Sequence, residues 1–147
     1  MTNKKDKKID YASLCLGATL SEQTCVMDEE LVGHYRAAVQ DDSDTMRDAE
    51  GTSLVPPMAV AAISLQGAIT ELHIPGGTLH VGHEINIIQT VKYGDTITCK
   101  ANISSNNVRG DWRFLGIEHT STNSLGSHVM TSKSTIMLPL EDTRGAK

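Results

Sequence analysis

Three aspartates, Asp41, Asp42 and Asp44, lie within four positions in the stretch HYRAAVQDDSDT, residues 34–45. They stand directly behind a Tyr-x-x-Ala-Val stripe with helical spacing. A carboxylate held in a loop behind a helix can act as a general base or hold a water molecule. It can equally do no more than end the helix in solvent. For Asp41, the residues alone leave both interpretations open.

A second candidate group is the segment HVGHE, in which His80 and His83 flank Gly82. Histidine can bind a metal or transfer a proton. Residues three apart in a strand point to opposite faces of the sheet, so both imidazoles reach one ion only across a bulge, at which Gly82 hints. We therefore expect no metal site. A hydrogen-bonded histidine near the core is favoured, and a proton-transfer role for His80 or His83 is the alternative.

A third group is the start of a long apolar run at Pro56, Pro57 and Met58. Proline is favoured in the first turn of a helix, where its missing N–H is not needed, so the pair predicts a helix start. Backbone N–H groups at such a start can bind a developing oxyanion. Two prolines remove two of these donors, so the remaining ones would come from Met58 onward. The alternative is a stiff helix start with no binding role.

Two helices are predicted from apolar spacing. Asp28 is expected to cap the first, whose stripe runs to Val39 and ends where the aspartates begin. The second, from Met58 to Leu72, is apolar on nearly every side, which predicts a central helix buried on most of its surface.

The remaining chain alternates apolar and polar residues, which predicts strands over residues 79–91, 97–103, 112–120 and 128–138. Residues 104–110 are expected to form a loop and residues 92–95 a hairpin turn, and one or two short extended pieces are expected within residues 11–25. This order predicts an α+β fold, with an antiparallel meander wrapped around the central helix. We expect one domain over residues 11–140, with a disordered tail over residues 1–10 and a polar tail over residues 141–147.

Composition excludes several classes of function. A net charge of −5 and 3% aromatic residues disfavour a nucleic-acid partner. No apolar run is long enough to span a bilayer, and the N-terminus does not resemble a secretory signal. Three cysteines without CxxC spacing, Cys15, Cys25 and Cys99, fit a reducing cytosol in which thiols act as small buried apolar groups. We expect a cytoplasmic protein without membrane, metal or cofactor.

Three segments carry a resemblance to a known family: YRAAVQDDSD, LVPPMAV and GGTLHVGHEINIIQTVKYGDTI, which together with their surroundings span roughly residues 20–138. They resemble the hotdog fold of MaoC-like dehydratases and R-specific enoyl-CoA hydratases, and most closely the short hotdog units of fatty-acid-synthase-type dehydratases. The resemblance implies a long antiparallel sheet around one apolar helix and an acyl-CoA or acyl-carrier thioester as substrate. It also implies that Pro57, Met58 and Gly82 contact this substrate.

In active members of that family, a loop aspartate and a histidine soon after it act together on water and the thioester. The family aspartate falls on Asp41, and the histidine should stand within Thr45-Met46-Arg47, where this chain has none. The His-Gly pair common at the helix start of active hydratases is replaced by Pro56-Pro57. Half of the acid–base pair is therefore missing. Related units of this kind pair with a second hotdog unit that carries the complete dyad.

Three hypotheses follow. The chain is a hydratase or dehydratase of acyl thioesters or a subunit of one, a thioesterase in which Asp41 activates water, or a non-catalytic acyl-CoA-binding or scaffold subunit. Each implies a homodimer or a heterodimer with another hotdog unit, because a single sheet of this kind leaves an exposed edge.

Overall fold

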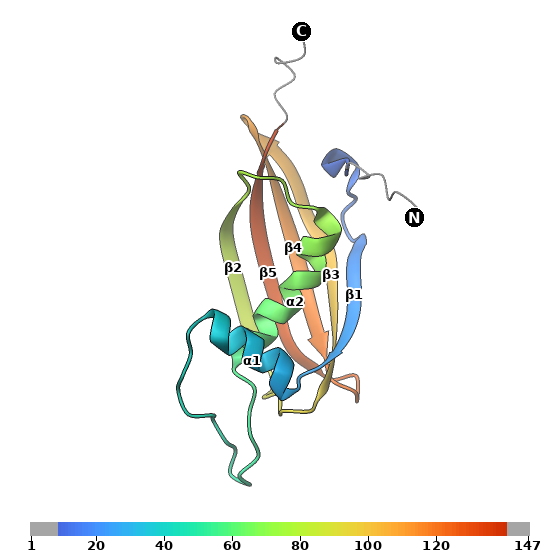
Figure 1. The fold of residues 1–147 in the computed structure, drawn as a ribbon. Coiled ribbons are helices and arrows are strands. Elements are labelled where there is room, and N and C mark those ends of the chain that lie inside the picture. The colour runs from blue at the N-terminus through green and yellow to red at the C-terminus, as the bar shows by residue number, and fades with distance from the viewer. Residues whose placement is uncertain (1–8, 141–147) are drawn as a thin grey trace, which may run out of the picture.

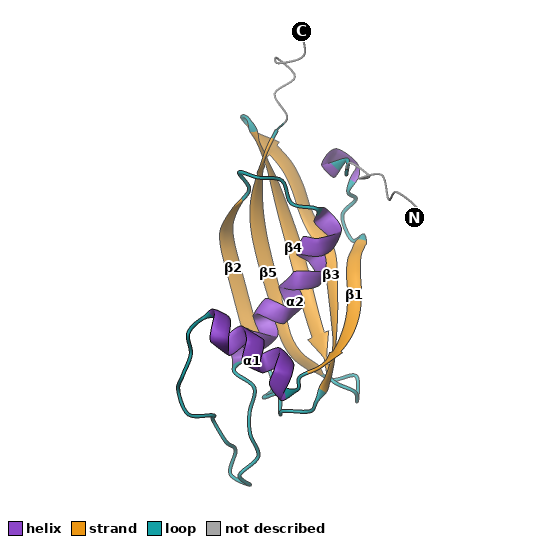
Figure 2. Cartoon of the chain, in the orientation of Figure 1, coloured by secondary structure: helices purple, strands orange, loops and turns teal. Residues whose placement is uncertain are grey.

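The computed structural model describes residues 9–140, which form one five-stranded antiparallel sheet, two α-helices and a short 3-10 turn. The sheet curves around helix α2 (Pro57–Leu72), and helix α1 (Glu29–Ala38) lies across one end of α2 (Figure 1; Figure 2). The 3-10 turn spans Tyr11–Ser13, and the strands are β1 (Thr19–Val26), β2 (Leu79–Ile87), β3 (Thr96–Arg109), β4 (Trp112–Thr122) and β5 (His128–Pro139). The α+β architecture is confirmed. Residues 1–8 and 141–147, most of the two predicted tails, lie outside the described residues.

Strand order corrects the predicted meander. The order across the sheet is β1-β3-β4-β5-β2, so β2 pairs with β5 and not with β3, its neighbour in sequence. The turn expected at residues 92–95 is present, but it carries the chain across to β3 instead of closing a hairpin. Strand β1 also exceeds the short extended pieces that were expected, because it pairs with β3 along nearly its whole length. Consequently β1 and β2 are the two edges of the sheet.

Residues 104–110 were expected to form a loop, and this prediction is wrong. Strand β3 continues to Arg109 and pairs with β4 up to Trp112, after a bulge between Ile103 and Ser105. The polar sequence misled the prediction because this part of the hairpin extends beyond the core, where side chains need not be apolar. Gly116 lies opposite the bulge, and a Cβ there would come within 2.3 Å of the Ser105 hydroxyl oxygen.

Helix α1 begins as its sequence predicts. The Asp28 carboxylate accepts a hydrogen bond from the Leu31 N–H at 2.9 Å, and Glu29 and Glu30 stand in the first turn, at the positive end of the helix. A cap of this kind is worth about 1 kcal/mol. After Ala38 the chain turns at Gln40, whose φ of 57° is left-handed, and the residue that follows is Asp41.

Helix α2 begins at Pro57 and ends before His73, which adopts a left-handed φ of 44°. The face toward the sheet is buried: Ala59, Val60, Ala61, Ile63, Ser64, Gly67, Ala68 and Leu72. The opposite face is exposed and includes Met58 and Ile69, with 52% and 43% of their surface accessible. The expectation of burial on most of the helix surface is therefore wrong for this single chain, because the sheet covers one side only.

Two groups of buried apolar side chains hold α2 in the concave face of the sheet. One surrounds the N-terminal half of the helix and comprises Met27, Val32, Val55, Ala59, Val60, Ala61, Ile63, Val91, Ile97, Cys99, Val129 and Met130. The other surrounds the C-terminal half and comprises Ala68, Leu72, Ala101, Ile103, Leu115, Ile117, Ile136 and Leu138. Aliphatic residues, Met and one Cys make up this core, as the low aromatic content requires.

Candidate functional site

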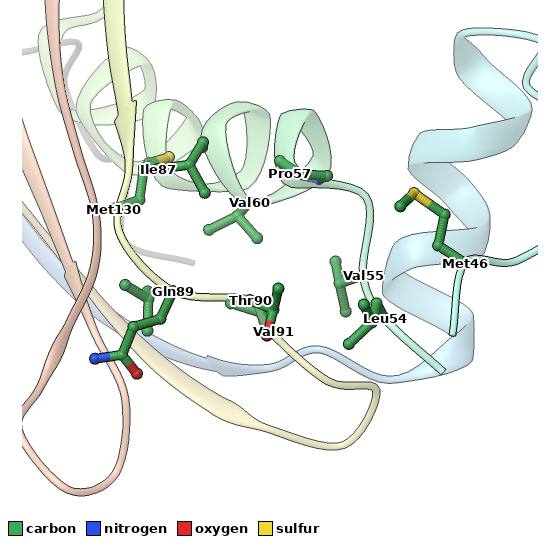
Figure 3. A pocket seen from close by; sticks show the side chains of 11 residues that line it. Met46, Leu54, Val55, Pro57, Val60, Ile87, Gln89, Thr90, Val91 and Met130 are labelled. Carbon is green, nitrogen blue, oxygen red and sulfur yellow. The ribbon is translucent and has the colours of Figure 1, made fainter. Parts of the chain in front are cut away.

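A pocket opens beside the N-terminus of α2, between the loop after α1 and the segment after β2 (Figure 3). Its empty volume of about 440 Å³ includes the open mouth. Pro57 and Val60 of the helix, Met46 of the loop and Ile87 of β2 are among its walls, as Figure 3 shows. The full lining is Met46, Leu54, Val55, Pro57, Val60, Ile87, Gln89, Thr90, Val91, Val129 and Met130.

The lining of this pocket is apolar apart from Gln89 and Thr90, and it contains no acid, histidine or cysteine. Met46 belongs to the Thr45-Met46-Arg47 segment, where the family resemblance expects a histidine. A thioether has no proton to give and is a weak acceptor. The pocket can therefore enclose an apolar group, but its own side chains offer no pair that could exchange protons with a substrate.

The helix start supplies a limited set of donors. Pro56 and Pro57 have no N–H, and the Ala59 N–H donates to the Pro56 carbonyl at 2.9 Å. The Met58 N–H is therefore the first-turn donor that has no acceptor within the helix. Its side chain is exposed and does not line the pocket, whereas Pro57 does. A carbonyl oxygen could meet the positive end of α2 here, with the Met58 N–H as the available backbone donor.

Asp41 is held within its own loop. Its carboxylate lies 3.4 Å from Arg36 Nε and accepts hydrogen bonds from the backbone N–H of Ser43, at 3.0 Å, and from the Ser43 hydroxyl. The guanidinium of Arg36 also donates to the Ser43 carbonyl. The Ser43 hydrogen bonds lower the pKa of Asp41, opposed by desolvation and assisted to a lesser degree by Arg36. Its affinity for a proton is thereby reduced.

Asp41 is also absent from the pocket lining. Asp42 and Asp44 are exposed, as expected for solvated loop residues. The geometry of this segment is thus that of a loop closed around Arg36, in which the Asp41 carboxylate accepts its hydrogen bonds from the residues that shape the loop.

His80 and His83 lie on the same face of the sheet, contrary to the strand-period argument. A bulge between His80 and Gly82 makes Val81 an extra residue, so His80 pairs with Ile136 and His83 with Ser134. Both partners are buried on the inner face, and the two imidazole rings are 5.2 Å apart between centroids. The bulge at which Gly82 hinted is therefore present. A Cβ on Gly82 would make only ordinary contact with Thr135, at 3.7 Å.

A third histidine, His119 of β4, faces the same side and was missed as a site residue. It is 2% exposed, and neither ring nitrogen has a hydrogen-bond partner among the described residues. Burial, together with the nearby His83 and His80, lowers the pKa of His119 to about 4. Burial and His80 also lower the pKa of His83. The available signal was the spacing of His119 two residues after Ile117, which places both side chains on the same face of the strand.

The three histidines do not form a metal centre. No group of three or more His, Cys, Asp or Glu side chains within residues 9–140 is arranged to hold an ion. None of the three lines the pocket at the start of α2. Of the predicted site residues, the pocket thus includes Pro57 but not Asp41, Met58, His80, Gly82 or His83.

Comparison with known proteins identifies the fold and the family. A family model described as the FAS1-like, dehydratase domain region matches residues 15–132. R-hydratase PhaJ1 from Pseudomonas aeruginosa superposes with a TM-score of 0.71 at 20% identity, over 89% of this chain and 86% of that one. A HadBC (3R-hydroxyacyl-ACP dehydratase) complex from Mycobacterium tuberculosis gives 0.67 at 18% identity, over 83% of this chain and 96% of that one.

A MaoC-domain dehydratase from Chloroflexus aurantiacus gives a TM-score of 0.76 at 14% identity. It is matched over 99% of this chain but only 44% of its own length, so this chain corresponds to less than half of that protein. A search of the curated proteins gave no match. No helix within residues 9–140 combines the length and apolar character that crossing a membrane requires. The fold is the hotdog fold that the sequence predicted, and the chain belongs to the FAS1-like dehydratase-domain family.

Proposed function

We propose that this chain is the catalytically incomplete half of a two-unit hotdog hydratase or dehydratase acting on acyl thioesters, carried on CoA or on a carrier protein. In this role the chain encloses part of the acyl group, and a second hotdog unit supplies the acid–base pair. The chain would work without a metal or another cofactor. We place the protein in the cytoplasm, and its domain at residues 11–140.

The observation that carries the proposal is the chemistry of the pocket at the start of α2. Apart from Gln89 and Thr90 its walls are aliphatic side chains and thioethers, and Met46 stands in the segment where a catalytic histidine is expected. Asp41, the matching carboxylate, accepts hydrogen bonds from Ser43 and pairs with Arg36 in its own loop. An apolar wall beside a helix N-terminus suits an acyl chain that ends in a thioester carbonyl.

A thioesterase has less support. Water activation would require a carboxylate near the thioester carbonyl and free to accept a proton. Asp41 lies outside the pocket lining, and its pKa is lowered by the hydrogen bonds from Ser43. Both features reduce its value as a base. The histidines on the inner face do not line the pocket either, so a role for His80 or His83 as the substitute base has no geometric support beyond their proximity to each other.

The test is to incubate the purified chain with a panel of trans-2-enoyl-CoAs and to identify the products by mass spectrometry, while binding is followed by calorimetry. We expect binding without product. Addition of one water would show a self-sufficient hydratase and overturn the proposal, and release of free CoA would favour the thioesterase. Absence of both binding and product would leave only the scaffold role. Met46→Glu places a charge in the apolar wall and should weaken binding at least tenfold, whereas Met58→Glu, on the exposed face of α2, should not.

A further inference from the structure

Two of the three cysteines face each other from neighbouring strands. Cys25 of β1 pairs in register with Ile97, and Cys99 of β3 pairs with Gln23, so the two cysteines are diagonal neighbours across the β1–β3 ladder. Both side chains point to the inner face, where Cys25 packs against the core group that contains Cys99. Cys99 is 2% exposed, whereas Cys25, on the edge strand, is half-buried.

The Cys99 sulfur lies in a polar niche inside an otherwise apolar core. Ser64 Oγ of α2 is 3.3 Å from Cys99 Sγ, and Ser121 Oγ of β4 is 3.7 Å from it. The two hydroxyls are also 2.8 Å apart, and Ser64 donates to the Val60 carbonyl at 2.7 Å. Ser64 gives its one hydroxyl proton to Val60, so Ser121 is the hydroxyl that donates to Cys99 Sγ. A donor beside the sulfur stabilises the thiolate, which is the reactive form of cysteine.

The protonation of the pair agrees with this geometry. The neighbouring Cys25 thiol, assisted by the serine hydroxyls beside Cys99 and opposed by burial, lowers the pKa of Cys99 to about 6. The neighbouring Cys99 sulfur, together with burial, raises the pKa of Cys25. The negative charge of the pair therefore resides on the buried sulfur, and the more accessible sulfur keeps the shared proton.

We propose that Cys25 and Cys99 are a redox-modifiable pair that forms a reversible disulfide between β1 and β3 when the chain meets a small disulfide. A disulfide usually joins Cα atoms about 4.4–6.8 Å apart, and diagonal neighbours in an antiparallel ladder lie about 7–8 Å apart. Closing the bond therefore requires the two strands to move about 1 Å closer at this point. Strand β1 can supply this movement, because this strand is an edge of the sheet. The proposal does not depend on the function proposed above.

The order of events follows from accessibility. Cys25 loses the shared proton to solvent, and its thiolate attacks one sulfur of the small disulfide while the other sulfur leaves as a thiolate. The Cys99 thiolate then attacks Cys25 Sγ and displaces the second small thiolate. The two cysteines lose two electrons and the small disulfide gains them, and the two released small thiolates take up the one cysteine proton and a second proton from solvent. Because Cys25 holds the shared proton, the first step should accelerate as the pH rises above neutral.

The test uses oxidised glutathione and the full chain in a Cys15→Ser background, because Cys15 is exposed and would react on its own. We expect the intact mass to fall by two hydrogens, with a peptide pair joined through Cys25 and Cys99 that dithiothreitol separates. An unchanged mass after prolonged exposure, or a stable glutathione adduct on Cys25 with Cys99 still reduced, would overturn the proposal.

Two further variants test the route, with circular dichroism to verify that each is folded. With Cys99→Ser added, the glutathione adduct on Cys25 should persist, because no second thiol resolves it. With Cys25→Ser added, Cys99 should stay unmodified, because it is buried. Rapid modification of Cys99 in that variant would contradict the assignment of Cys25 as the thiol that reacts first with glutathione. Ser121→Ala should slow the resolution of the adduct severalfold, since it removes a hydroxyl beside the attacking sulfur.

Discussion

His119 is a buried imidazole on the inner face of the sheet, and both of its ring nitrogens lack a partner among the described residues. Burial lowers the pKa of His119 to about 4, against an ordinary value of 6.5. The unfolded chain therefore binds a proton that the folded chain rejects between these two values. By linkage, stability is full above pH 6.5 and is lost as the pH falls through this window.

The prediction is that His119→Leu flattens the pH dependence of unfolding. At pH 5 the unmodified histidine costs about 2 kcal/mol relative to neutral pH, and the leucine variant should lose this dependence. Urea denaturation at pH 7.5 and pH 5 measures the difference. His128→Gln, at an exposed histidine, is the matched control and should retain the full dependence. Equal pH dependence in the His119 variant and the parent would contradict the assignment.

The role of Asp41 could be predicted from the sequence only in part. Its position in the family pattern predicted a catalytic carboxylate, and its place behind α1 predicted a loop residue. Which of the two holds depends on contacts that no spacing reveals, namely those with Arg36 and Ser43. The absent histidine, by contrast, was visible in the sequence itself, because no histidine stands between His34 and His73.

Among the elements, each α-helix contains one glycine, and only the one in α2 is required by a close contact. Gly67 faces β1, and a Cβ there would come within 3.0 Å of the Gln23 side chain, whose amide donates to the Ile63 carbonyl at 3.4 Å. Gly33 of α1 has no atom within 4 Å of the same position. The glycine in α2 therefore permits close approach of helix and strand, and the one in α1 only adds flexibility to the unfolded chain.

We predict opposite effects of substitution at these two glycines. Gly33→Ala should raise the free energy of unfolding by about 0.5–1 kcal/mol, through helix propensity alone. Gly67→Leu should lower it by about 1–3 kcal/mol, because the larger side chain must displace Gln23 and separate α2 from β1. Thermal and urea unfolding of the two variants measure both effects. Stabilisation by Gly67→Leu would show that the space between α2 and β1 accommodates a leucine side chain, contrary to the short distance to Gln23.

The existence of the elements was largely readable from sequence, while their arrangement was not. The cap at Asp28 and the prolines before Met58 marked both helix starts, because these signals are local. Apolar alternation identified β2 as a strand but could not reveal that it pairs with β5 at the far edge, since periodicity does not name a partner. The bulge that turns His80 inward is likewise a matter of register.

For the whole molecule, the main feature left exposed is the sheet edge formed by β2, with its apolar side chains. Strand β2 is an edge of the sheet, and Leu79, Val81 and Ile87 along it are 50%, 50% and 44% exposed. The outer face of α2 adds Met58 and Ile69. An edge with free backbone groups and apolar side chains favours strand pairing with another chain. A hotdog partner would satisfy the edge, in keeping with the match of this chain to less than half of the Chloroflexus protein.

We predict that the purified chain dimerises with a second copy through β2 when no other hotdog unit is present. Val81→Lys puts a charge on this edge and should weaken the dimer at least tenfold, which corresponds to about 1.4 kcal/mol. Val108→Lys, at a residue of β3 that is 49% exposed, is the matched control and should leave the dimer intact. Sedimentation velocity over a range of concentrations measures both. A parent chain that stays monomeric at every concentration would exclude self-pairing. The apolar side chains of β2 would then still be exposed in the isolated chain, and a different hotdog unit would be needed to cover them.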